Sequence, residues 1–119
     1  VTVVILTYNH KNYIEEAVNS VLMQKTDYNI DILIGDDCST DNTYDIVKDI
    51  STNNNQIRYY QNSTNLGVTK NLQYANALGI PYVIILGPEE VKKNKVLLRN
   101  MKTGEESLLT LKQVIKKLT

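Results

Sequence analysis

The chain has 119 residues, 42% of them apolar and 22% charged, which excludes a disordered or fibrous protein and fits one compact domain spanning residues 1–119. The net charge of zero hides an asymmetry. Residues 1–69 carry nine acidic and four basic side chains, and residues 70–119 carry four acidic and nine basic ones. An acidic half suits a metal ion or sugar hydroxyls and a basic half suits phosphate or RNA, whereas complementary surfaces of one fold would give the same pattern.

Two classes of chemistry are disfavoured by the composition. Cys38 is the only cysteine and His10 the only histidine, so an internal disulfide is excluded and a zinc site of the usual His/Cys type is not expected. The sequence has no stretch near 18 uninterrupted apolar residues, and its opening apolar run lacks the basic flank of a targeting signal. We therefore expect a cytoplasmic protein with no membrane span and no zinc.

Strand and helix patterns alternate through the first part of the chain. Short β-branched apolar runs ended by polar residues are typical of buried parallel strands, and apolar residues at helical spacing predict the helices between them. The expected strands are residues 1–6, 30–35 and 57–61, and the expected helices are Lys11–Met23 and a segment around Ile46–Ile50.

The later part of the chain continues this alternation and then changes. A helix carrying Leu72, Ala75 and Leu78 precedes a buried strand at residues 81–86. After Gly87 the pattern predicts one helical turn, a hairpin and a last helix. The turn is residues 88–93, the hairpin strands are residues 96–98 and a return near Ser107, and the helix follows a capping box of Thr110 and Gln113.

These elements predict an α/β fold. Strands joined through helices by short right-handed crossovers form a mainly parallel sheet with helices on both faces. The expected architecture is a three-layer α/β/α sandwich with a Rossmann-like sheet, closed by a C-terminal β-hairpin and a final helix.

Polar residues follow the strands at the edge where such sheets bind ligands. Thr7, Tyr8 and Asn9 end the first strand, and Asp36 and Asp37 end the second. Two adjacent carboxylates repel each other unless donors or a cation face them, so the pair indicates a base, a ribose or a metal. The alternative is that the acidic and hydroxyl residues of this segment only cap the following helix.

The same segments resemble the family 2 type of inverting nucleotide-sugar glycosyltransferases with the GT-A fold. The resemblance covers roughly Val1 to Ala75. It is carried by Thr7-Tyr8-Asn9, by Tyr13 to Leu22, by Asp36-Asp37-Cys38-Ser39-Thr40-Asp41 and by Asn65-Leu66-Gly67.

This resemblance implies a site for the nucleotide of a nucleotide sugar. Thr7, Tyr8, Asn9, Asp36 and Asp37 would contact the base and ribose, and Asp41 would cap a helix.

The family's metal motif is altered in this chain. Members carry an Asp-x-Asp motif that holds a divalent cation, Mg²⁺ or Mn²⁺, after the fourth strand, where this chain has Gly87-Pro88-Glu89-Glu90. Glu89 and Glu90 are the remaining candidates for metal binding, although glutamate is one methylene longer than aspartate. No acceptor-binding segment with the usual catalytic base is seen, so we expect this half to be incomplete as a catalyst.

Residues from Leu72 to the C-terminus resemble another family. Gly79-Ile-Pro-Tyr-Val-Ile-Ile-Leu-Gly87, then Glu89-Glu90-Val91 and Arg99-Asn-Met-Lys-Thr-Gly-Glu105, are similar to the end of the anticodon-binding domain of histidyl-tRNA synthetases. That resemblance implies weak RNA binding, with Glu89, Glu90 and Arg99 near the RNA. It implies no aminoacylation, since no catalytic synthetase motif is present.

Two resemblances in one chain imply a chimera. The division falls near residue 70, with a glycosyltransferase-like half at 1–70 and an anticodon-binding-like half at 71–119. Three functions remain open: a nucleotide-sugar binding domain, a hybrid of two α/β folds without activity, and a weak RNA-binding module.

Overall fold

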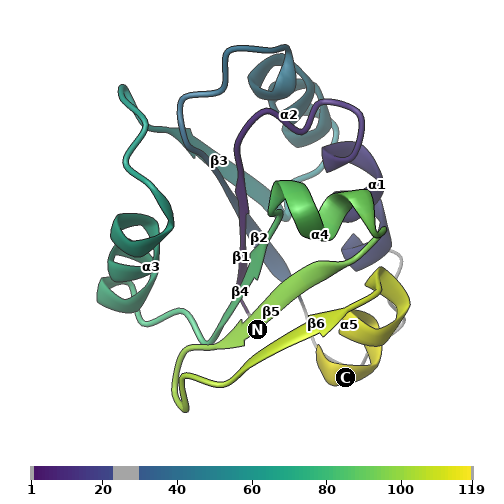
Figure 1. The fold of residues 1–119 in the computed structure, drawn as a ribbon. Coiled ribbons are helices and arrows are strands. Elements are labelled where there is room, and N and C mark those ends of the chain that lie inside the picture. Colours follow the sequence, from purple (N-terminus) through teal and green to yellow (C-terminus); the bar gives the residue numbers. More distant parts are fainter. Residues whose placement is uncertain (1, 23–29, 119) are drawn as a thin grey trace.

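The computed structural model describes residues 2–22 and 30–118, in which six strands form one sheet flanked by helices (Figure 1). The strands are β1 Thr2–Thr7, β2 Asp31–Asp36, β3 Ile57–Gln61, β4 Tyr82–Ile85, β5 Val96–Asn100 and β6 Glu106–Leu109. The helices are α1 Ile14–Leu22, α2 Thr43–Thr52, α3 Val68–Ala77, α4 Pro88–Lys92 and α5 Leu111–Leu118.

The sheet has the strand order β3-β2-β1-β4-β5-β6 and is parallel from β3 to β4. Strand β5 pairs antiparallel with β4, and β6 pairs antiparallel with β5. Val4 at the centre of β1 lies opposite Leu33 on one side and Val83 on the other. The predicted fold class is confirmed, including the hairpin and the final helix.

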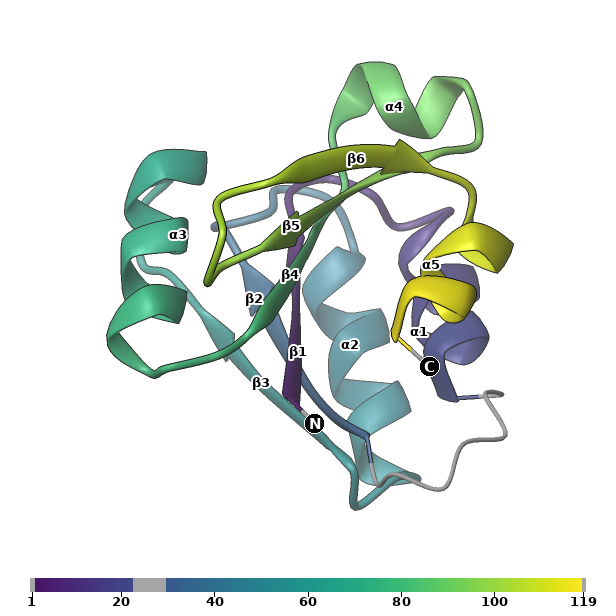
Figure 2. The same ribbon diagram turned by 90° about the horizontal axis from the view of Figure 1, so that it is seen from below.

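One face of the sheet is covered by α1, α2 and α5 (Figure 2). Side chains alternate along a strand, so Val3 and Ile5 point to this face. They share one apolar cluster with residues of the flanking helices, Ile14 and Val18 of α1, Val47 of α2 and Val114 of α5. The last helix thus completes the core on this face.

The opposite face carries α3 (Figure 2). Val4, Leu6, Val83 and Ile85 form a smaller apolar cluster with Ala75 of this helix. At its β3 side, the ring of Tyr60 lies against the backbone of Gly35 and meets the ring of Tyr74 edge to face, with 5.2 Å between the ring centroids. Gly35 provides the space, because a Cβ there would lie 2.6 Å from the Cζ atom of Tyr60.

Element boundaries differ from expectation mainly at α1. This helix begins at Ile14, because residues 11–13 form a turn in which the backbone N–H groups of Tyr13 and Ile14 both donate to the carbonyl of His10. The expected end at Met23 lies outside the described residues. The capping box before α5 is confirmed: Thr110 N–H donates to Gln113 Oε1 at 2.9 Å, and Gln113 N–H donates to Thr110 Oγ1 at 3.3 Å.

Within the described part of the chain, no helix has the length and apolar character needed to cross a bilayer.

Candidate functional site

The carboxyl ends of β1, β2 and β4 meet at one edge of the sheet. The backbone N–H of Asp37 donates to the carbonyl of Thr7 at 2.9 Å, and the N–H of Leu86 donates to the carbonyl of Leu6 at 3.1 Å. A small pocket of about 50 Å³ opens there. Its lining residues are Leu6, Thr7, Tyr8, Asp37, Val68, Asn71, Ile85 and Leu86. The structure therefore brings Thr7, Tyr8 and Asp37 together at the position expected for a ligand.

Thr7 and Tyr8 present different surfaces to this pocket. Thr7 is only 3% exposed, and its Oγ1 atom has no hydrogen-bond partner among the described residues. Burying a hydroxyl without a partner costs about 1–3 kcal/mol in proteins, so a ligand that bonds to it would recover free energy. Tyr8 is 41% exposed, and its ring is free to lie against a planar group.

Asn9 joins the loop after β1 to the loop after β2. Its backbone adopts φ 56°, and its Oδ1 atom accepts from the N–H groups of Thr40 at 2.7 Å and Asp41 at 3.3 Å. Its own N–H donates to Ser39 Oγ at 2.9 Å. In the structure Asn9 holds two loops together.

The two adjacent aspartates occupy different environments. Asp36 has no exposed surface, and its carboxylate accepts from Ser39 N–H at 3.2 Å, from the Ser39 hydroxyl and from Gln61 Nε2 at 2.9 Å. These bonds fix the turn after β2 against β3. Three donors facing one carboxylate offset the cost of its burial.

Asp37 orders the segment that follows β3. Its carboxylate accepts from Asn62 Nδ2 and from the N–H groups of Leu66 and Gly67, each at 2.9 Å. Burial on its own raises the pKa of the Asp37 carboxyl, but hydrogen bonds from the Leu66 backbone, from Asn62 and from the Gly67 backbone outweigh it and lower the pKa below its ordinary value. The group is therefore an anion at neutral pH, beside the pocket.

Asp41, which the sequence predicted to cap α2, lies one residue before the N-cap residue Asn42. Its Oδ1 atom accepts from the N–H of Thr43 at 2.9 Å, at the start of α2, and its Oδ2 atom accepts from the N–H of Lys11 at 3.3 Å. Burial raises the pKa of this carboxyl, and the stronger opposing effect of the hydrogen bonds from Thr43 and Lys11 lowers it overall.

The two glutamates proposed for a metal lie on α4. Glu89 pairs with Lys92 at 3.6 Å, where both side chains are largely exposed. Glu90 folds back so that its carboxylate lies over the α-carbon of Gly87 at the end of β4. Among the described residues, no group of three or more His, Cys, Asp or Glu side chains gathers around a common point.

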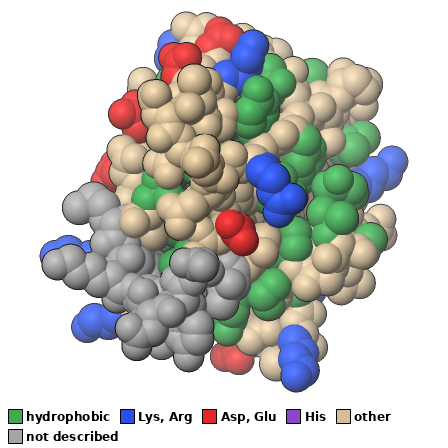
Figure 3. All heavy atoms as spheres, turned by 180° about the vertical axis from the view of Figure 1, so that it is seen from behind, with side chains coloured by type: hydrophobic (Ala, Val, Ile, Leu, Met, Phe, Trp, Pro, Cys, Tyr) green, Lys and Arg blue, Asp and Glu red, His purple; other side chains and the backbone are tan. Residues whose placement is uncertain are grey.

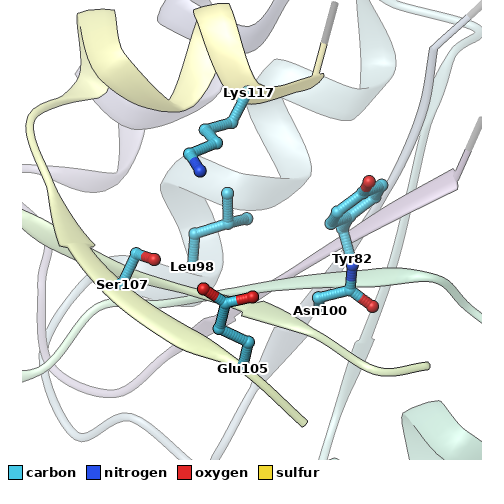
Figure 4. A pocket seen from close by; sticks show the side chains of 6 residues that line it. All are labelled: Tyr82, Leu98, Asn100, Glu105, Ser107 and Lys117. Atoms are coloured by element: carbon cyan, nitrogen blue, oxygen red, sulfur yellow. The ribbon is translucent and has the colours of Figure 1, made fainter. Parts of the chain in front are cut away.

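A second pocket, of about 190 Å³, lies away from the strand ends, between the sheet and α5. Figure 4 shows Lys117 reaching down from α5 and Glu105 reaching up from the hairpin, with Leu98 between them. Tyr82 at the start of β4 borders it, so this pocket lies at the opposite end of β4 from Thr7 and Asp37. None of the predicted site residues contributes to it.

Basic side chains form no single patch on the face seen in Figure 3. Lys and Arg are scattered there among hydrophobic, acidic and other side chains. The described residues of this face therefore offer no continuous basic track of the kind that nucleic-acid backbones favour.

Comparison with known proteins identifies the family. The sequence profile of glycosyl transferase family 2 matches residues 2–86, and the chain belongs to this family. The match extends through β4 to Leu86, further than the resemblance seen in the motifs.

Solved glycosyltransferases have a similar fold. A mannosyltransferase from Pyrobaculum calidifontis in complex with GDP-Man and Mn²⁺ superposes with a TM-score of 0.59 at 24% identity. S. aureus TarS in complex with UDP superposes with a TM-score of 0.55 at 29% identity. Each alignment covers 71% of this chain and 26% of the other.

The chain also resembles a histidine–tRNA ligase from Finegoldia magna, with 49% identity over 49 residues. This segment is 41% of the chain and spans only 11% of the ligase. Both predicted resemblances are confirmed, and the sequence has the features of a hybrid between a glycosyltransferase and a synthetase segment.

Sequence reasoning missed several residues of the site. Asn62 and Asn71 meet at 2.9 Å next to Asp37, and Asn71 also donates to the carbonyl of Gly67 at 2.8 Å. Residues 62–67 were predicted only as a turn because asparagine and glycine are ordinary turn residues. The one available signal was Asn71, a polar residue at a position that faces the core in the periodicity of α3.

Proposed function

We propose that the chain is the nucleotide-binding part of a glycosyltransferase and binds the nucleoside diphosphate of a nucleotide sugar at the ends of β1, β2 and β4. The observation that carries the proposal is the buried Thr7 hydroxyl, which lacks a partner and lines a pocket beside the Asp37 carboxylate. The family match to residues 2–86 supports it, as does similarity to TarS, whose structure was solved with UDP.

The five predicted contact residues divide into two roles in this proposal. Thr7, Tyr8 and Asp37 line the pocket and contact the nucleotide, with the exposed Tyr8 ring available to stack on the base. Asn9 and Asp36 hold the loops that shape the pocket, since their polar atoms bond to Thr40, Ser39 and neighbouring groups.

In a transfer reaction, this part of the enzyme would hold the leaving diphosphate while an acceptor displaces it at the anomeric carbon of the sugar. A divalent cation would neutralise charge on that leaving group. The chain's own residues would supply position and hydrogen bonds, and the acceptor would require surfaces beyond this pocket.

Calorimetric titration of UDP, GDP and dTDP into the full chain, with and without Mn²⁺, tests the proposal. The informative variant is Thr7→Val, which removes the hydroxyl and keeps the side-chain shape. Because Thr7 Oγ1 has no partner in the free protein, this variant should fold with equal or higher stability and bind the preferred nucleotide about tenfold more weakly.

Thr69→Val on the exposed side of α3 is the matched control and should leave affinity unchanged. A folded protein that binds none of the three nucleotides at millimolar concentration would contradict the proposal and leave a hybrid without this activity.

Weak RNA binding is a second candidate, favoured by the 49% identity to a histidine–tRNA ligase segment and by the basic character of residues 70–119. Fluorescence titration of a labelled RNA stem-loop over a range of salt concentrations tests it. Phosphate contacts by several lysines would make the affinity fall steeply with salt, whereas an affinity that does not change with salt would speak against this candidate.

A further inference from the structure

The pocket between the sheet and α5, here called the α5 pocket, is formed by Tyr82, Leu98, Asn100, Glu105, Ser107 and Lys117. Its floor consists of two cross-strand pairs, Tyr82 opposite Asn100 and Leu98 opposite Ser107. The apolar part of this floor is the buried side chain of Leu98 and the half-buried ring of Tyr82. The α5 pocket shares no residue with the nucleotide pocket, so a ligand of its own could occupy it.

The size of the α5 pocket limits what it can hold. Its volume is about 190 Å³. Pockets for drug-sized ligands have about 300–1,000 Å³, and a water molecule takes about 30 Å³ of the liquid, so a ligand here replaces roughly six waters. A nucleotide is too large for this space, whereas a metabolite with roughly ten non-hydrogen atoms fits it.

Two groups of opposite charge enter the α5 pocket from different elements. Lys117 extends into it from the last turn of α5 and Glu105 extends into it from the turn between β5 and β6, with Leu98 between them (Figure 4). Among the described residues, neither of the two forms a salt bridge. A small molecule that carries both a carboxylate and an ammonium group would contact both ions at once.

Uncharged polar groups lie beside the two ions. Asn100 Oδ1 accepts from the backbone N–H groups of Lys102 at 3.0 Å and Thr103 at 3.2 Å, which holds the amide in place and leaves its nitrogen as a donor. In Figure 4 this nitrogen lies on the Tyr82 side of the pocket. The Ser107 hydroxyl, on the opposite side, can donate to a carboxylate or accept from an ammonium group. Polar groups thus surround an apolar centre.

We propose that the α5 pocket binds a free α-amino acid with an apolar side chain, such as leucine. The carboxylate of the ligand pairs with Lys117, its ammonium group pairs with Glu105, and its side chain covers Leu98 and the ring of Tyr82. A ligand with a single charge would contact only one of the two ions. This inference goes beyond the proposed function and does not depend on it, because none of these residues lines the nucleotide pocket.

Titration of the full chain with leucine, followed by NMR of the backbone amides, tests the inference. A ligand of this size is expected to bind with a Kd of about 1 mM. It should shift the amide signals of Tyr82, Leu98 and Ser107. Isoamylamine, which is leucine without its carboxylate, and isocaproate, which is leucine without its ammonium group, should each bind about fivefold more weakly.

Two variants assign each charge of the ligand to its partner. Lys117→Gln should weaken leucine binding about fivefold and leave isoamylamine binding unchanged, because isoamylamine has no carboxylate. Glu105→Gln should weaken leucine binding to a similar extent and leave isocaproate binding unchanged. Lys112→Gln, on the same helix but outside the pocket, and Glu106→Gln, whose carboxylate pairs with Arg99, are the matched controls. Both should bind leucine as the unmodified chain does, and all four side chains are exposed, so the variants should fold.

Three results would overturn the inference. The first is that leucine, far above the expected Kd, shifts none of the three amides in a chain that melts cooperatively. The second is equal binding of leucine, isoamylamine and isocaproate, since the paired charges would then not be recognised. The third is a loss of leucine binding in Lys112→Gln as large as that in Lys117→Gln. None of these results bears on UDP binding beside Thr7 and Asp37, so the proposed function is tested separately.

Discussion

Side-chain hydrogen bonds have a different reach in residues 1–70, the first part of the molecule, and in residues 71–119, the second part. In the first part several of them join segments far apart in the sequence: Asn9 bonds to Thr40, and Asp37 bonds to Leu66 and Gly67. Others in this part are local, such as the bond from the Ser51 hydroxyl to the carbonyl of Lys48. In the second part they close local turns, as Asn100 does with Lys102 and Thr103.

This difference separates residues that shape a site from residues that shape the chain locally. A side chain that bonds across about thirty positions has to be placed by the fold, and it orders loops at the strand ends. A side chain that bonds two or three positions away needs only its own turn or cap. Both parts nevertheless contribute to one apolar cluster, in which Ile34 and Leu98 are members.

The largest expected effect tests whether the two parts share a core. Ile34→Ala in β2 and Leu98→Ala in β5 should each lower the free energy of unfolding by about 3 kcal/mol, because each removes buried apolar groups from the same cluster. Urea denaturation should give a single transition that shifts in both variants. A Leu98→Ala variant whose main transition stays in place would show that the second part folds apart from the first.

A smaller effect is expected from the long-range polar bonds. Asp37→Ala should lower the free energy of unfolding by about 2 kcal/mol, because it leaves the N–H groups of Leu66 and Gly67 without their acceptor. Asn100→Ala, the local counterpart, should cost about half as much because its turn is exposed to water. Equal losses of unfolding free energy, measured by urea denaturation, would show that the long-range bonds of Asp37 stabilise the protein no more than the local bonds of Asn100.

Acid should remove part of the stability that the hydrogen bonds of Asp37 supply. The pKa of the Asp37 carboxyl lies below its ordinary value of 3.8, so its contribution to stability is complete above that pH and is lost as the pH falls through the lower, folded-state pKa. Urea midpoints measured from about pH 6 down to about pH 3 should therefore fall. The loss should be milder than in Asp37→Ala, since a protonated carboxyl still accepts hydrogen bonds.

In Asp37→Asn this position no longer titrates, and the midpoint should depend less on pH over the same range. An identical acid response in the variant would assign the effect to other carboxyls.

The smallest effect is expected at a local cap of the second part. Thr110→Ala removes the hydroxyl that accepts from Gln113 N–H and should cost about 1 kcal/mol. Nucleotide binding should not change, because α5 lies away from the strand ends. UDP titration by calorimetry checks this. A loss of UDP affinity in Thr110→Ala would show that α5 and the strand ends are coupled.

Much of the fold could be predicted because it follows from periodicity. Strand β3 has the predicted bounds, and α3, the hairpin and the capping box of Thr110 and Gln113 all occur where patterns of apolar and turn residues indicated them. The start of α1 was predicted at Lys11, whereas the helix begins at Ile14. Periodicity does not detect the intervening turn, which is closed by the carbonyl of His10.

The candidate site was only partly predictable. Its location followed from the rule that ligands bind at the ends of parallel strands, which identified Thr7 and Asp37. The sequence could not distinguish Asp36 from Asp37, since burial and partners depend on the loop after β3. The contact of Glu90 with Gly87 depends on how α4 folds back, and spacing alone does not reveal that.

The position of β4 has a consequence for how such a hybrid could arise. In the described part of the chain, it is the only strand after residue 70 that pairs with a strand before it, through four residue pairs from Val3 and Tyr82 to Leu6 and Ile85. A join within α3, the position that the sequence motifs predict, would have to keep the register of this single short strand. Recombination between unrelated α/β domains is structurally easiest where such a narrow seam connects them.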